Sequence, residues 1–83
     1  MNEEERSAMV ANMVHCKTMG EKAYDDMYEA HSFGDANCCY RDAKDFFYEA
    51  IRLAGELGLA EEGESLSKRL EHIKGVFRSQ FVQ

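Results

Sequence analysis

The sequence predicts an all-α protein, and two features of the chain support this fold class. Proline, the strongest helix breaker, does not occur among the 83 residues, and Ala, Leu, Glu, Lys, Arg and Met are plentiful. Apolar residues recur at intervals of three and four, as expected for helices with one buried face. A chain of this length forms one small domain, so we expect a single helical domain over residues 1–83.

The first helix is expected from about residue 3 to residue 31. Its apolar positions recur at helical steps from Met9 to Tyr28, and the glutamates at residues 3–5 place negative charge at the positive end of the helix. Gly20 interrupts this helix and costs up to about 1 kcal/mol relative to alanine. We therefore expect Gly20 to mark a close helix contact or a slight bend.

A turn with Gly, Asp and Asn follows at residues 32–37, and a second helix is expected from about residue 36 to residue 57. Asp35 is expected to cap the start of this helix, and Gly58 to end it in a left-handed conformation. Residues placed at 100° steps give the helix an apolar arc of roughly 160° opposite a polar one. Because one neighbour cannot cover so wide an arc, we expect both other helices, or one of them and a partner chain, to pack on it.

The third helix is expected from about residue 60 to residue 81. Acidic residues lie near its start, and Lys74 and Arg78 lie near its end, as the helix dipole favours. The connections between the helices are short, so neighbouring helices should be antiparallel. The predicted fold is therefore an up-down-up antiparallel three-helix bundle with helices at about 3–31, 36–57 and 60–81.

The charge and the cysteines restrict the class of partner and the compartment. A formal net charge of −6 argues against nucleic acid as a partner, because binding to a polyanion depends on Lys and Arg. No apolar run approaches the roughly 20 residues that span a bilayer, and the acidic start of the chain is unlike a signal peptide. Three cysteines without a framework spacing fit reduced thiols. We therefore expect a cytoplasmic protein without membrane association.

Residues 40–53 of the second helix carry a pattern of aromatic and small residues. Tyr40, Ala43, Phe47 and Ala50 follow one another at intervals of three, four and three, and Leu53 comes next. This pattern resembles the second helix of a tetratricopeptide repeat, and the layout of the whole chain is similar to that of the three-helix microtubule-interacting and trafficking domain. Both resemblances imply a helical fold. A single repeat does not imply the peptide-binding groove that about three stacked copies form.

The histidines and cysteines lack the spacing of known metal and catalytic sites. A structural zinc site usually shows a Cys-x₂-Cys or His-x₃-His pair, and a di-iron bundle shows Glu-x-x-His; none of these occurs here. The adjacent histidine and cysteine of the first helix would point in different directions. We therefore predict no enzyme activity and no cofactor. The alternative is a metal- or small-molecule-binding protein that uses His31, Cys38 and Cys39 around the turn at residues 31–39.

Four residues are candidates for a surface that contacts a partner. Phe46 and Leu53 are expected to border the polar arc of the second helix, Tyr48 to lie beyond its other edge, and Phe81 to lie near the end of the chain. Partly exposed aromatic residues are enriched in protein interfaces. The sequence therefore predicts a non-catalytic protein that acts through protein–protein contact. The sequence does not identify the partner protein, and we expect the chain to self-associate as a homodimer.

Overall fold

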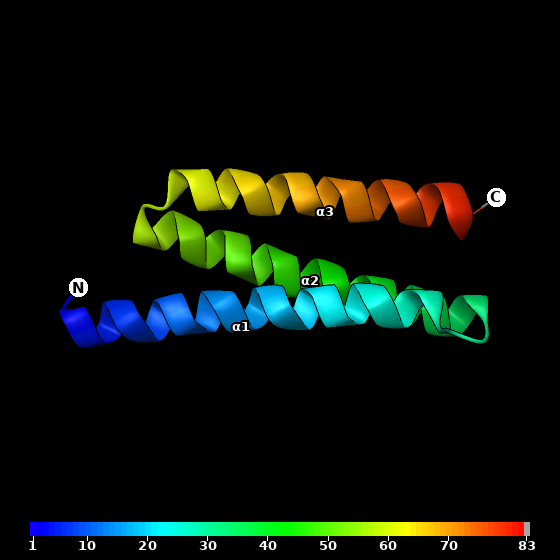
Figure 1. Ribbon diagram of the computed structural model, residues 1–83, viewed down its shortest axis with the longest axis horizontal. Coiled ribbons are helices and arrows are strands. Elements are labelled where there is room, and N and C mark those ends of the chain that lie inside the picture. Colours follow the sequence, from blue (N-terminus) through cyan, green and yellow to red (C-terminus); the bar gives the residue numbers. More distant parts are fainter. Residues whose placement is uncertain (83) are drawn as a thin grey trace.

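The computed structural model describes residues 1–82, which form three helices: α1 (Glu3–Tyr28), α2 (Phe33–Leu57) and α3 (Ala60–Gln80). Figure 1 shows that consecutive helices run in opposite directions, with α2 between α1 and α3. The Cα atoms span 47 × 19 × 12 Å, so the molecule is long and flat. The predicted all-α, up-down-up three-helix bundle is confirmed, and residues 1–82 contain no strand. None of the helices in this part of the chain is long and apolar enough to cross a membrane.

Side-chain caps determine where the first two helices begin. Asn2 accepts a hydrogen bond from the Glu5 N–H (2.8 Å) at the start of α1, and Ser32 accepts one from the Asp35 N–H (3.1 Å) at the start of α2. The prediction that Asp35 caps the second helix is wrong, because the Ser32 hydroxyl already occupies the capping position. As a result α2 begins three residues earlier than expected, and α1 ends at Tyr28 rather than near residue 31.

Gly58 ends α2 as predicted. Its φ of 71° lies in the left-handed region that glycine adopts freely, and its N–H bonds to the carbonyls of Ala54 and Gly55. The chain enters α3 at Ala60, only two residues later. This tight connection makes α2 and α3 antiparallel neighbours.

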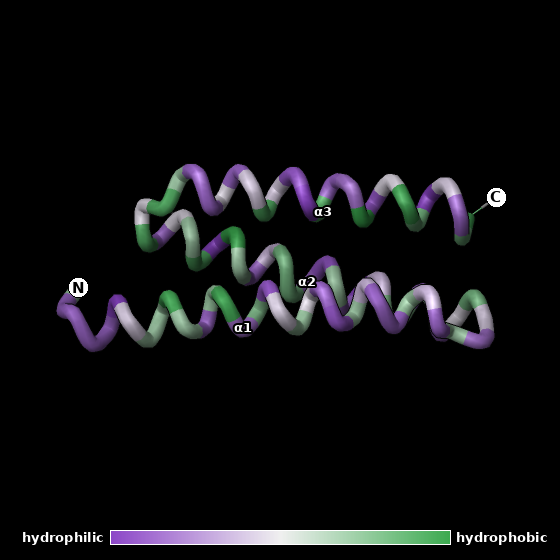
Figure 2. Tube along the Cα trace, viewed as in Figure 1, coloured by the Kyte–Doolittle hydropathy of each residue, from purple (hydrophilic) through white to green (hydrophobic). Residues whose placement is uncertain are grey.

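The middle helix, α2, is the centre of the core. Seven of its residues are buried, whereas α1 and α3 contribute four each. In Figure 2 the hydrophobic positions of α3 lie on the side of that helix turned toward α2. Helices α1 and α3 together cover the wide apolar arc of α2, so its burial does not require a partner chain.

Helices α1 and α2 approach each other closely where Gly20 lies over Phe47. A Cβ atom added at Gly20 would lie 2.7 Å from two ring atoms of Phe47, whose side chain is fully buried. Ala43 and Ala50, one turn to either side of Phe47, are fully buried as well. The predicted close helix contact at Gly20 is confirmed, and it depends on small residues that let the two backbones come together.

Candidate interaction site at the aromatic end

Six aromatic side chains gather at one end of the molecule, where α1 ends, α2 begins and α3 ends. We call this region the aromatic end; its members are Tyr24, Tyr28, Phe33, Tyr40, Phe77 and Phe81. The up-down-up course of the chain brings these three segments to the same end, at the right of Figure 1. Residues that are far apart in the sequence therefore form one cluster.

Phe77 of α3 lies at the centre of this cluster. Its side chain is 6% exposed, and its ring stacks on Tyr40 of α2 with the centroids 3.9 Å apart and the planes 5° apart. Phe81 stacks on Phe77 with a centroid distance of 5.8 Å, and the Phe33 ring lies 6.0 Å away. Because one buried ring contacts two rings of α2, it holds the start of α2 against the end of α3.

Two tyrosines connect α1 to the same cluster. The hydroxyl oxygens of Tyr24 and Tyr28 form a hydrogen bond at 2.9 Å, and the two rings meet edge to face at 5.3 Å. Burial, together with this hydrogen bond, raises the pKa of Tyr24 from its ordinary value of 10 to about 12. The Tyr28 ring also meets Phe81 edge to face at 5.9 Å, which joins the end of α1 to the end of α3.

The outer side chains of the aromatic end are open to solvent. Phe33 is 56% exposed, Tyr28 is 48% exposed, and Val82, next to Phe81, is 46% exposed. The rings of Phe33 and Tyr28 rest on Phe77 and Phe81, so packing holds them in place while their outer surfaces remain uncovered. Aromatic residues held in this way are typical of the anchors in protein interfaces.

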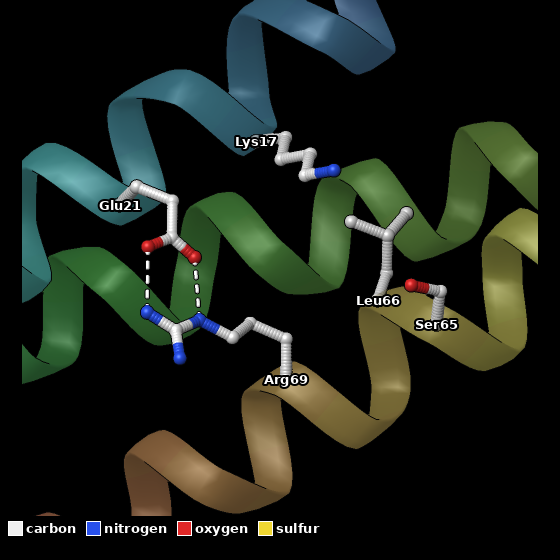
Figure 3. Close-up of a pocket in the computed structure, with 5 residues that line it drawn as sticks. All are labelled: Lys17, Glu21, Ser65, Leu66 and Arg69. Carbon is white, nitrogen blue, oxygen red and sulfur yellow. Dashed lines mark hydrogen bonds and ion pairs between the residues drawn. The ribbon is translucent and has the colours of Figure 1, made fainter.

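Polar side chains join α1 to α3 beside the aromatic end. The Glu21 carboxylate accepts two hydrogen bonds from Arg69, 2.7 Å from Nε and 2.8 Å from Nη2, and α2 lies behind this bridge (Figure 3). The hydrogen bonds lower the pKa of Glu21 and raise the pKa of Arg69. The Arg69 guanidinium also lies 5.1 Å from the centre of the Tyr24 ring. The bridge therefore continues directly into the aromatic end.

A shallow hollow lies between α1 and α3 at this bridge. Its lining residues are Lys17, Glu21, Ser65, Leu66 and Arg69 (Figure 3). Glu21 and Arg69 bind each other, and the Lys17 Nζ lies 3.9 Å from a carboxylate oxygen of Glu62. The charged groups of the hollow thus pair within the chain, and its polar character is explained by the contact between the two helices.

The four residues predicted to contact a partner lie in different surroundings. Leu53 is 6% exposed and belongs to the core, so its place at the edge of the apolar arc does not leave it open to a partner; α1 and α3 together cover the arc as far as this residue. Tyr48 is 50% exposed, and its hydroxyl accepts a hydrogen bond from Lys74 of α3 at 2.7 Å. Phe46 is half-buried on the α1 side of α2, and Phe81 belongs to the aromatic end.

The turn between α1 and α2 carries the residues considered for a metal site. His31 and Cys38 are exposed, and Cys39 is half-buried, with the pKa of its thiol raised by burial. Over residues 1–82, no three His, Cys, Asp or Glu side chains lie close enough together to hold a metal ion. The described part of the chain therefore gives the metal-binding alternative no ligand set.

Tyr28 and Phe33 are the surface residues that the sequence-based prediction missed. Short connections between antiparallel helices put the end of the first helix, the start of the second and the end of the third at one end of the bundle. Aromatic residues at these three positions are therefore expected to meet, and this signal was present in the sequence. The exposure of Tyr28 and Phe33 depends on which aromatic ring fills the centre of the cluster. In the structure this ring is Phe77.

No protein-family model, no curated protein and no solved structure matches the chain. The similarity of residues 40–53 to the second helix of a tetratricopeptide repeat therefore stays a prediction, as does the similarity of the layout to the microtubule-interacting and trafficking domain. What can be inferred about function comes from the surfaces described above.

Proposed function

We propose that the chain is a small, non-catalytic helical protein that acts through contact with other proteins, including a second copy of itself. One observation carries this proposal: Tyr28 and Phe33 are about half exposed, and each rests on a buried ring of the same cluster, Tyr28 on Tyr24 and Phe33 on Phe77. Side chains that packing already holds in place lose little conformational entropy when a partner covers them. A rigid, exposed aromatic surface is thus better suited to recognition than to stabilising the fold.

Self-association is proposed at the margin of α2, around Phe46. This residue is half-buried on the side of α2 next to α1 and lies near the middle of the helix, away from the aromatic end. Complete burial of a phenylalanine side chain is worth roughly 1.5–3 kcal/mol, so covering its exposed part in a twofold contact would stabilise a dimer. Such a contact leaves the aromatic end free for a different partner.

Sedimentation equilibrium tests this contact. We expect the parent protein to be a dimer at tens of micromolar and Phe46→Glu to be a monomer with an unchanged helical circular dichroism spectrum. Asn12→Glu is the matched control, because it adds the same charge at an exposed position of α1 and should remain a dimer. A monomeric parent would remove the self-association proposal.

We also propose a cytoplasmic location. Cys16, Cys38 and Cys39 are free thiols in the structure, and a reducing compartment keeps thiols in this state. Fractionation of the native cell with thiol labelling tests the location, and recovery of the protein in an oxidising compartment with a native disulfide would contradict it.

A further inference from the structure

Three carboxylates lie near the end of α1, the helix that carries the exposed Tyr28. They are Asp25, Asp26 and Glu29, and the last turn of this helix contains no basic residue. Within residues 1–82 none of the three side chains forms an ion pair or a hydrogen bond; Asp25 acts electrostatically on Arg69, but Glu21 already holds that guanidinium. The C-terminal end of a helix carries a partial negative charge, so carboxylates there are unfavourable unless a cation offsets them.

The other charges at this end do not balance the carboxylates. Arg78 lies in the last turn of α3, and the Lys44 Nζ lies 4.6 Å from the centre of the Tyr40 ring. Against these two cations stand the three carboxylates of α1 and Asp35, which adds a further negative charge in the first turn of α2. Carboxylates thus outnumber cations at this end of the molecule. This combination of an exposed apolar surface and an excess of negative charge defines the chemistry of a complementary partner.

We propose that the aromatic end binds a basic, amphipathic segment of another protein. Its apolar side chains would cover Tyr28, Phe33 and Phe81, and one of its Lys or Arg side chains would pair with Glu29, which follows Tyr28 directly. A bound cation would also offset the unfavourable charge at the end of α1. This inference names the partner class for the contact function proposed above, and it depends on that function.

The size of the exposed surface favours a segment over a second copy of the chain. An aromatic side chain covers about 150–250 Å², so the exposed halves of Tyr28 and Phe33 offer roughly 100 Å² each. A stable interface between two folded proteins buries about 800 Å² on each partner. Two copies would in addition bring like charges together, whereas one face of a helix with a few apolar anchors fits a small apolar surface with a charged border.

The binding test uses three short helical peptides with the same spacing. The first has leucines on one face and lysines on the other, the second has glutamate in place of lysine, and the third has serine in place of leucine. Fluorescence anisotropy should detect binding of the Lys/Leu peptide only, and the affinity should fall as salt screens the charges. Equal binding of the Glu/Leu peptide, or no binding of the Lys/Leu peptide, would overturn the proposal.

Charge-reversal variants locate the binding site. Glu29→Lys should weaken binding of the Lys/Leu peptide several-fold. Because basic residues are favourable at a helix C-terminus, this variant should be at least as thermostable as the parent, which separates lost binding from lost folding. Asp45→Lys is the matched control: it reverses one exposed carboxylate on the polar side of α2 and should bind the peptide nearly as well as the parent.

A second pair of variants tests the apolar part of the surface. Phe33→Ser should weaken binding of the Lys/Leu peptide several-fold. Val14→Ser, at a position of α1 that is 52% exposed, should leave this binding unchanged. Unchanged binding in both the charge-reversed and the Phe33→Ser proteins would place the peptide elsewhere and overturn the proposal. Failure of the peptide to bind, together with a dimer that depends on Phe46, would overturn the basic-segment proposal and leave the general contact function in place.

Discussion

The contact at Gly20 and the aromatic end use opposite means to join helices. At Gly20, α1 and α2 come close enough that a Cβ atom would lie 2.7 Å from the Phe47 ring, and Phe47 is fully buried. At the aromatic end, large rings fill the space between the three helices, and Phe33 remains 56% exposed. Both phenylalanines belong to α2, so one helix supplies a completely buried ring and a largely open one.

This difference separates stability from recognition. A fully buried ring contributes the whole of its transfer free energy to folding, and a ring that is more than half exposed contributes a small part of it. Replacing Phe33 with a polar residue would lower the stability of the protein only slightly and would remove the exposed apolar surface. The presence of phenylalanine there fits a surface that a partner covers, which is the basis of the function proposed above.

The largest expected effect compares the two phenylalanines directly. Phe47→Ala should lower the free energy of unfolding by about 3–5 kcal/mol, because it leaves a cavity beneath Gly20 in a small core. Phe33→Ala removes the same atoms from a position that is 56% exposed and should cost about 1 kcal/mol or less. Urea denaturation followed by circular dichroism measures both values, and losses of equal size would contradict the distinction between the two regions.

The next prediction compares two glycines within helices. Gly20→Ala should destabilise the protein by about 1 kcal/mol or more, because its methyl group would collide with the buried Phe47 ring. Gly75→Ala is the matched control: a Cβ atom there meets nothing within 4 Å, so the gain in helix propensity should stabilise the protein by about 0.5–1 kcal/mol. Thermal unfolding of the two variants should therefore give shifts of opposite sign.

Most of the architecture could be predicted from the sequence, because it depends on local patterns. The absence of proline and the three- and four-residue spacing of apolar positions predicted three helices, and Gly58 marked the end of α2. The start of α2 was missed because Ser32 and Asp35 are both good capping residues, and only the structure shows which side chain meets a free N–H. For Gly20, in the middle of a helix, the sequence predicted either a close helix contact or a slight bend, and the structure shows the close contact.

The candidate site was less accessible to sequence reasoning, because exposure is a property of the whole bundle. The width of the apolar arc suggested that Leu53 lies at its margin, yet packing by two helices buries it. Tyr48 was expected to be partly exposed, but its hydrogen bond to Lys74 depends on the position of α3 relative to α2. The sequence predicts Phe33 in the turn at residues 32–37, and its contact with Phe77 depends on the position of α3 relative to α2.

The smallest expected effect concerns the bridge between α1 and α3 that leads into the aromatic end. The hydrogen bonds from Arg69 lower the pKa of Glu21 below its usual value near 4.5, so the folded state favours the ionised carboxylate. The stability from this pair is fully present above the pKa of Glu21 in the unfolded chain and is lost as the pH falls through the lower pKa of the folded state. Because the two side chains are 38% and 34% exposed, its size should be below about 1 kcal/mol.

Glu21→Gln tests this bridge without removing the side chain. The variant should be less stable than the parent at pH 7, and the difference should shrink as the pH falls below about 4.5, where the parent carboxylate becomes protonated as well. Glu64→Gln is the control, because Glu64 pairs with Lys68 within α3 and both side chains are largely exposed. A difference for Glu21→Gln that grew toward acid pH would have the wrong sign for a bridge that favours the ionised carboxylate, and would show that Glu21 and Arg69 do not hold α1 against α3.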